Sequence, residues 1–295
     1  MSQAIQDFST RSRGADSFST ALPENLPPHL TEPKMRSDLR AYDTIARDPK
    51  YRHFVRIPER IIHCLDYFRI AGNRVAVRRL LHAYYVFIGV VDNAIDSGEL
   101  GIGSVVLYHF ERRTPVIGES TISDVTLMTE VLKCHISDDV YLLMLSKLRK
   151  LYQEVVSERT ATSIESYIEQ RKAVGRLTAE LSYLLIRPLL AGEHENLRDF
   201  MQQVGAVGCI IDSIIDLDAD RRLGLLSFKP TIKCYAKLTC CALLDGLRLA
   251  SKHPRLSGLF FQAIIDNVRD RFGRQQGTAL CSIVSDRKDQ APSVA

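Results

Sequence analysis

The stretch that decides the fold is residues 207–220, with the sequence VGCIIDSIIDLDAD. Asp212, Asp216 and Asp220 recur at i, i+4 and i+8, which places their carboxylates on one face of a helix. Most residues between them are Ile or Leu, as in a helix that packs inside a protein. Like charges at this spacing repel one another, and an apolar environment raises the cost. Because a divalent cation would turn the repulsion into attraction, we expect a Mg²⁺ site on this face.

A second acidic segment lies upstream at residues 84–96, with the sequence YYVFIGVVDNAID. Its apolar residues predict a buried helix, and Asp92 and Asp96 lie about one helical turn apart at its end. Glycines within residues 98–103 indicate that the helix ends there. For this pair alone, a solvated helix end explains the pattern as well as a metal site does. Three in-phase aspartates in an apolar helix favour metal, and two acidic segments in one chain strengthen that interpretation.

Helical periodicity extends along most of the chain. Ser137 and Ser163 are followed by acidic residues and predict helix starts, and Pro188 predicts a kink in the helix that contains it. No series of alternating strands is present, so we predict an all-α protein. Apolar residues repeat at helical spacing from Leu39 and again from Ile61. Beyond them, we expect helices at residues 74–97, 122–135, 137–158, 163–192, 195–221, 232–251 and 257–275.

The chain has 295 residues, of which 45% are hydrophobic, and this length and composition suit one large domain. Residues 1–35 are rich in Ser, Thr and Pro and predict a flexible N-terminal arm. We expect an all-helical domain at residues 36–280 and a flexible C-terminal tail at residues 281–295.

Charge and cysteine usage exclude several classes of protein. A net charge of +4, from 39 basic and 35 acidic residues without a sustained basic run, argues against nucleic-acid binding. The seven cysteines show neither metal-binding nor disulfide spacing, which indicates a reducing compartment, and we expect a cytoplasmic protein. No apolar stretch reaches the roughly 20 residues of a membrane-spanning helix, so no integral membrane segment is expected.

Together, the two acidic segments resemble those of the class I isoprenoid synthases, a superfamily of trans-prenyltransferases, squalene and phytoene synthases, and class I terpene synthases. Residues 92–96 are similar to its first Asp-rich motif, and residues 212–220 to its second, on the opposite wall of one cavity. Residues 178–192 are similar to the stretch before the second motif in prenyltransferases, and residues 221–224 resemble squalene and phytoene synthases. The likeness covers about residues 75–235. It implies a single bundle of roughly ten or more helices around a central apolar cavity.

The chain departs from each branch of this superfamily. Elongating prenyltransferases have two arginines after the first motif, which hold a second diphosphate, and here residues 97–100 are Ser-Gly-Glu-Leu. Squalene and phytoene synthases usually have Asn at the position of Asp212. Terpene synthases usually have Asn, Ser and Glu at the positions of Asp212, Asp216 and Asp220. The missing arginines disfavour simple chain elongation, although the early chain could supply such donors from Arg56, Arg60, Arg74, Arg78 or Arg79.

The resemblance implies ionisation of an allylic diphosphate with about two or three Mg²⁺ ions held by both motifs. The candidate catalytic and metal-binding residues are Asp92, Asp96, Asp212, Asp216 and Asp220. Donors near the second motif are candidates for binding the diphosphate: Tyr167, Arg171, Lys172, Arg176, Arg221 and Arg222. For each basic residue, a surface charge is the alternative explanation. Because a carbocation must be kept from water, we expect an apolar wall built from Tyr84, Phe87, Ile88, Leu181, Leu184, Leu185 and Ile211, unless these are ordinary core.

We therefore expect a Mg²⁺-dependent class I terpene synthase that converts one C15 or C20 prenyl diphosphate to a terpene hydrocarbon or alcohol plus diphosphate. One alternative is head-to-head coupling of two prenyl diphosphates, as in squalene and phytoene synthases. Another is a non-catalytic helical binding protein with a prenyltransferase fold, because a fold does not determine an activity. A homodimer is one possible oligomeric state, and the sequence does not decide it.

Overall fold

The computed structural model describes residues 42–97, 99, 101–112, 123–266 and 269. The predicted arm at residues 1–35, the predicted tail at residues 281–295 and the domain boundaries beside them lie outside these residues. The chain divides into two compact units, Met1–Thr44 and Ile45–Ala295. Of the first unit, only residues 42–44 are described, and they are helical.

The described part of the second unit is built from helices and contains no β-strand, which confirms the all-α prediction. In chain order, its elements are η3 (Pro49–Tyr51), α3 (Arg52–Val55), α4 (Ile57–Tyr67), α5 (Arg74–Asp96), α6 (Ile102–Glu111), α7 (Asp124–Lys133), α8 (Asp138–Arg159), α9 (Ile164–Ile186), η4 (Arg187–Leu189), α10 (Glu195–Arg222) and α11 (Ile232–Lys252). A last described helix follows at Ser257–Asp266.

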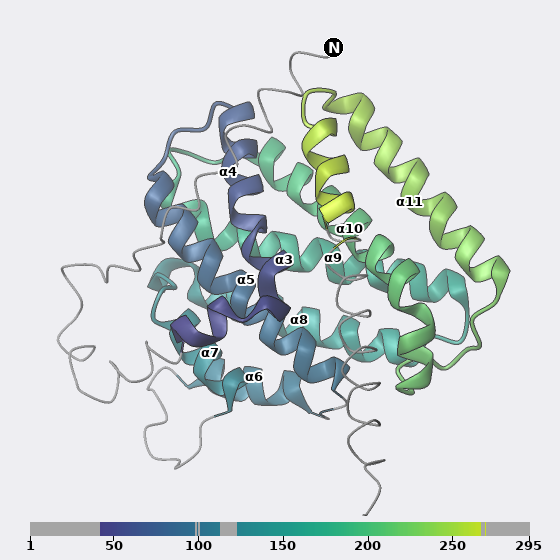
Figure 1. Ribbon diagram of the computed structural model, residues 1–295. Coiled ribbons are helices and arrows are strands. Elements are labelled where there is room, and N and C mark those ends of the chain that lie inside the picture. Colours follow the sequence, from purple (N-terminus) through teal and green to yellow (C-terminus); the bar gives the residue numbers. More distant parts are fainter. Residues whose placement is uncertain (1–41, 98, 100, 113–122, 267–268, 270–295) are drawn as a thin grey trace, which may run out of the picture. The chain divides into compact units, whose positions relative to one another are not determined.

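Helix α9 lies at the centre of the second unit, where it packs against α5, α8, α10 and α11 (Figure 1). Over residues 179–186 every side chain is buried, so no side of this part of the helix faces solvent. Helix α5 contributes to the same core and packs against α4, α7 and α9. The burial of α5 confirms the prediction from the apolar residues of the segment 84–96.

The closest helix pair is α9 and α10, which cross at two glycines. A Cβ atom added at Gly175 would overlap the carbonyl oxygen of Gly205, and one added at Gly205 would overlap the carbonyl oxygen of Gly175. The two backbones therefore meet without a side chain between them, which only glycine permits. This crossing sets how far the residues of α10 stand from those of α9.

Most predicted helix positions are confirmed, including two predicted starts. Ser163 is the N-cap of α9, and its hydroxyl accepts a hydrogen bond of 3.2 Å from the Ser166 amide. Ser137 is the N-cap of α8, although its side chain makes no capping bond.

The predicted kink at Pro188 is wrong, because the helix ends there instead of bending. Helix α9 stops at Ile186 and a 3₁₀ turn, Arg187–Leu189, follows. Proline at residue 188 has no amide hydrogen to continue the helical bonding, and the chain leaves in an extended conformation at Leu190.

Helix α6 was not predicted. The glycines that follow α5 were interpreted as a loop, but Gly101 adopts a left-handed backbone with φ of 79° and is the N-cap of the new helix. The glycine thus separates two helices that lie close together in sequence.

By length and composition, one described helix could cross a membrane, namely α10. It packs against α9 and α11 in the second unit, and 39% of its most apolar stretch is buried. Length and hydropathy are therefore weak evidence for a membrane span here.

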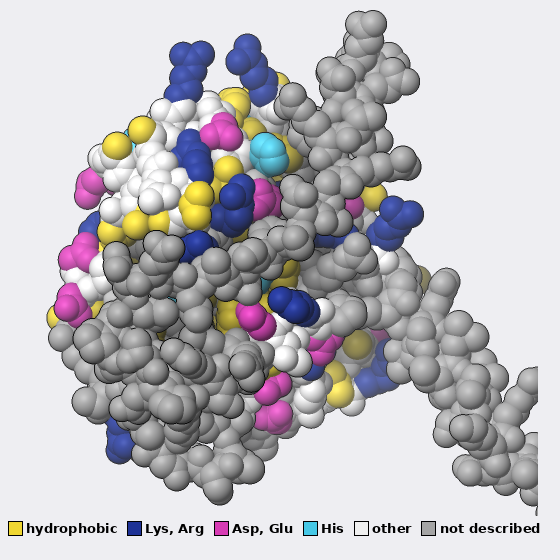
Figure 2. Space-filling model, turned by 60° about the vertical axis from the view of Figure 1, so that its left-hand side comes forward, with side chains coloured by type: hydrophobic (Ala, Val, Ile, Leu, Met, Phe, Trp, Pro, Cys, Tyr) yellow, Lys and Arg dark blue, Asp and Glu magenta, His cyan; other side chains and the backbone are white. Residues whose placement is uncertain are grey.

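On the face that Figure 2 shows, basic, acidic and apolar side chains alternate over the described surface. The described part of this face shows no extended area of a single charge.

We expect Gly175→Ala to lower the free energy of unfolding by about 1–3 kcal/mol, because the added methyl group forces α9 and α10 apart. Gly208→Ala, on the same α10, is the matched control, because a Cβ there meets nothing within 4 Å. It should raise stability by about 0.5–1 kcal/mol through the better helix propensity of alanine. Urea denaturation followed by circular dichroism measures both, and equal effects of the two changes would contradict the tight crossing.

Candidate functional site

A cavity of about 360 Å³ lies between α4, α5, α9, α10 and the helix Ser257–Asp266. Its size falls within the range of small-molecule binding sites. Its wall is largely apolar, with Phe200 and Met201 from α10, Val174 from α9 and Phe260 from the last helix. The cavity can therefore enclose a ligand with a sizeable apolar part.

Four of the predicted aspartates line this one cavity. Asp92 comes from α5, and Asp212, Asp216 and Asp220 come from successive turns of α10. Asp92 is exposed, whereas the three on α10 are half-buried. The structure thus brings together two acidic segments that are far apart in the sequence. The side chain of Asp96, the last residue of α5, lies outside the described part of the structure.

Electrostatics make this arrangement costly without a cation. The charged residues of the cavity wall are five aspartates and three arginines, so its acidic groups outnumber its basic ones. Asp220 lies in the last turn of α10, and Asp96 ends α5. The unpaired carbonyls at a helix C-terminus carry partial negative charge, which favours cations and disfavours carboxylates. A divalent cation would relieve both sources of repulsion.

The donor set fits Mg²⁺ bound together with a phosphate ligand. Among the described residues, no three His, Cys, Asp or Glu side chains form a ready-made metal cage. Mg²⁺ rarely uses such cages, since it prefers one or two carboxylates, several waters and phosphate oxygens. The carboxylates on α5 and α10 could each hold ions on their own side of a shared anionic ligand.

Arg171 anchors the acidic face of α10. Its Nε donates to the Ser213 hydroxyl over 2.9 Å, and its Nη1 lies 3.3 Å from a carboxylate oxygen of Glu158 on α8. The Ser213 hydroxyl also accepts from Tyr167 and donates to the carbonyl of Cys209, so its bonding capacity is filled. Although burial works against the charge of Arg171, Glu158 holds its pKa well above the ordinary value. Arg171 therefore stays a cation in the cavity wall, next to Asp212.

Two further arginines enter the cavity from the start of α4. Arg56 and Arg60 both line it, and Arg60 Nη2 donates to Asp266 Oδ2 over 2.8 Å across to the last helix. Both belong to the early arginines, with Arg74, Arg78 and Arg79, that the sequence offered as donors for a second diphosphate. The four-residue spacing of Arg56 and Arg60 was a visible signal, but nothing in the sequence joined it to Asp92.

The other predicted diphosphate-binding residues lie elsewhere among the described residues. Lys172 Nζ stands 2.9 Å from Asp245 of α11, and Arg176 is exposed. Arg221 and Arg222 are exposed and donate to the carbonyls of Leu226 and Asp218.

Tyr167 lies in the core beside Ser213 and does not line the cavity. Burial raises the pKa of its phenol to about 12. Its hydroxyl supports the Arg171 anchor through Ser213 rather than facing a ligand.

Of the predicted apolar wall, Ile88 and Ile211 line the cavity. The other five residues are buried in the packed core and are absent from the described cavity wall: Tyr84, Phe87, Leu181, Leu184 and Leu185. Tyr85 and Ile88 are the residues of α5 that line the cavity together with Asp92. Ile88 lies three positions after Tyr85 and four before Asp92, so the three side chains share one helical face. Counting back from the aspartate at helical spacing would have found them.

The cavity also contains two cysteines, Cys64 and Cys209. Burial raises the pKa of each thiol to about 12. Both stay protonated near neutral pH and act as small apolar groups, so neither is an activated nucleophile.

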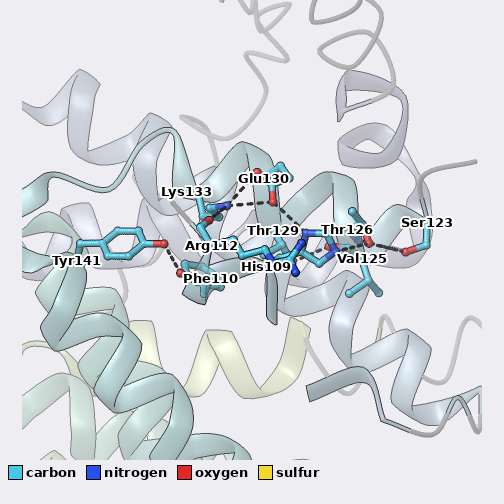
Figure 3. A network of polar contacts seen from close by, with 10 residues as sticks. All are labelled: His109, Phe110, Arg112, Ser123, Val125, Thr126, Thr129, Glu130, Lys133 and Tyr141. Atoms are coloured by element: carbon cyan, nitrogen blue, oxygen red, sulfur yellow. Dashed lines mark hydrogen bonds and ion pairs between the residues drawn. The ribbon is translucent and has the colours of Figure 1, made fainter. Parts of the chain in front are cut away.

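A second polar cluster joins α6, α7 and α8 away from the cavity (Figure 3). Lys133 Nζ donates to the Arg112 carbonyl over 2.6 Å and to Glu130, whose carboxylate lies 3.0 Å from His109 Nδ1. Tyr141 of α8 donates to a carbonyl of α6. None of these residues lines the cavity, and their mutual bonds account for the burial of Lys133 and His109.

Comparison with known proteins gives no relative: no family model matches the chain, and no curated protein or solved structure is significantly similar to it.

We expect Arg171→Leu to lower the free energy of unfolding by about 3 kcal/mol, because it leaves the carboxylate of Glu158 without its buried partner. Arg149→Leu is the control, since its 2.9 Å pair with Glu111 is exposed on both sides and should contribute less than about 1 kcal/mol. Urea denaturation distinguishes them. If the two variants were equally stable, the anchor would be no stronger than a surface ion pair.

Proposed function

We propose that this protein is a Mg²⁺-dependent class I terpene synthase, which ionises one allylic prenyl diphosphate of C15 or C20 and releases diphosphate with a terpene hydrocarbon or alcohol. The observation that carries the proposal is that Asp92 of α5 and Asp212, Asp216 and Asp220 of α10 line one cavity whose wall is otherwise largely apolar. Mg²⁺ held by the aspartates would bind the diphosphate group of a prenyl diphosphate. The apolar part of the wall would bind its prenyl chain.

The proposal includes the isoprenoid synthase fold. Its support is the order of the parts: two long helices, α5 and α10, carry the two acidic segments near their C-terminal ends, and α9 packs against both. The resemblance of residues 92–96 and 212–220 to the two Asp-rich motifs supports it independently.

The residues divide the work between the two ends of the substrate. The aspartates of α5 and α10 would hold the metal ions on either side of the diphosphate. When bound, Mg²⁺ would supply charge neutralisation and Lewis-acid assistance to the leaving group. Arg171 would add hydrogen-bond donors at the same end, because its position is already fixed by Glu158 and Ser213.

The apolar side of the cavity would hold the prenyl chain and keep water from the cation that forms when the C–O bond breaks. Ile88, Val174, Met201 and Phe260 supply such a surface.

A second candidate function is head-to-head coupling of two prenyl diphosphates, and Arg56 and Arg60 are the observation that favours it. Chain elongation and coupling each require a place for a second diphosphate, and the segment after Asp96 lacks basic residues. Two arginines from α4 in the same cavity could provide that place. Asp266 already pairs with Arg60, which weakens the case for a free second site.

We expect Asp92→Asn and Asp216→Asn each to lower kcat/KM for diphosphate release by about 100-fold or more, because each removes a ligand from a metal site that contributes several kcal/mol. Asp218→Asn is the matched control, since Asp218 is exposed on the same helix and absent from the cavity wall. EDTA should abolish activity and Mg²⁺ should restore it. Normal turnover by either cavity variant would reassign its aspartate to a structural role.

We expect the protein, with Mg²⁺, to convert C15 or C20 prenyl diphosphate to a product with the same number of carbons, as mass spectrometry of extracts would show. A product with twice the carbons would establish head-to-head coupling, and Arg56→Met should then abolish it. A five-carbon increment that requires isopentenyl diphosphate would contradict both functions. No diphosphate release from any chain length would favour a helical binding protein.

A further inference from the structure

Helix α11 is apolar on two opposite faces. Its inner face contributes Cys234, Leu238 and Leu249 to the core, where they pack among residues of α9, α10 and α4. Its outer face is also apolar: Ile232 is 87% exposed, and Leu243 and Leu247 are 60% and 61% exposed. Figure 1 shows α11 along the outer side of α10. A surface helix normally has polar residues on this side.

The exposed apolar residues form one continuous stripe. Ala236, Cys240, Leu243 and Leu247 are all exposed and follow one another at intervals of four, three and four residues, which keeps them on a single face. Ile232 begins the same stripe one turn earlier. Contiguous exposed apolar surface of this kind marks a binding surface for a protein or a membrane.

The neighbouring helix extends the apolar surface of this region. Ser257–Asp266 packs against α11, with Phe260 beside Gly246, and it exposes Phe261 and Ile265 by 53% and 58%.

The charges of α11 decide what kind of surface this face can meet. Its four basic residues are exposed, and three of them lie on one flank of the apolar stripe: Lys233, Lys237 and Arg248. The fourth, Lys252, is the last residue of the helix and lies on the side of the inner face. Its single acidic residue, Asp245, is half-buried and held by Lys172 of α9 at 2.9 Å. Lys237 pairs with Glu165, and Arg248 with Asp245, which leaves the flank basic on balance.

A second copy of the chain is a poor occupant of this face. Two α11 helices packed along their stripes would bring two basic flanks together, with no exposed acidic residue on the helix to compensate. An apolar stripe beside a row of Lys and Arg instead matches a membrane surface, where leucines enter the headgroup boundary and cations remain at anionic phosphates.

We propose that the outer face of α11 binds the surface of membranes that contain anionic lipids, with the helix lying in the plane of the interface. Leu243 and Leu247 insert, and Lys233 and Lys237 contact the headgroups. The protein then binds the membrane as a peripheral protein, through this face of α11. The inference does not depend on the proposed function, because it rests on residues outside the cavity.

Sedimentation with vesicles tests the proposal on the full-length protein. Wild type should bind vesicles of equimolar phosphatidylglycerol and phosphatidylcholine, and high salt should weaken the binding. Vesicles of phosphatidylcholine alone should bind it at least about tenfold more weakly, since each Lys or Arg near an anionic surface contributes several-fold.

Two α11 variants and one control complete the experiment. Leu243→Gln combined with Leu247→Gln should weaken binding about tenfold or more, because two inserted side chains lose their apolar burial. Lys233→Gln combined with Lys237→Gln should act similarly on anionic vesicles alone. Leu142→Gln, at an exposed leucine of α8, should have no effect. Circular dichroism confirms that each variant is folded.

Three results would overturn the proposal. The first is equal binding by wild type and the Leu243/Leu247 variant, and the second is no binding of wild type to either kind of vesicle. The third is a wild-type dimer that the Leu243/Leu247 variant dissociates, as sedimentation equilibrium would show, because a second copy would then cover the face. If an acidic partner protein covered this face in place of a membrane, wild type would bind neither kind of vesicle, which is the second result.

Discussion

The close approach of α9 to α10 is the contact on which the site depends. At Gly175 and Gly205 the two backbones meet directly, and at this separation Arg171 reaches the hydroxyl of Ser213. That bond joins α9 to α10 beside Asp212. Together with the packing of α10 against α9 and α11, it keeps Asp212, Asp216 and Asp220 at the cavity.

The cavity combines features that are unfavourable until a ligand arrives. Several carboxylates line it beside apolar residues, near the C-terminal ends of α5 and α10, where the backbone is itself partly negative. A polyanion alone would add to the repulsion, and a cation alone would leave the apolar wall empty. A metal-bound anion with an apolar chain satisfies the acidic and apolar parts together, which is the physical basis of the proposed substrate class.

Several features were determined by the sequence alone, because they depend on local periodicity. The all-α class, most helix positions and the shared face of Asp212, Asp216 and Asp220 follow from residues a few positions apart. The N-cap at Ser163 follows from the bonding of its own side chain to an amide three residues later. Two predictions at this level failed: α9 ends near Pro188 instead of bending, and helix α6 was missed. A proline or a glycine can end, bend or separate helices, and the conformation of the residues that follow decides which of these occurs.

Only the tertiary structure decided which residues surround the cavity. Moving one residue along a helix rotates the side chain by about 100°, so Tyr84 lies in the core while Tyr85 lines the cavity. The direction of the cavity is set by the helices packed around α5, and no local pattern contains it. Arg60 and Asp266 meet across the cavity although they are far apart in the chain, because the packing of α4 against the last helix, rather than any spacing in the sequence, brings them within hydrogen-bond distance.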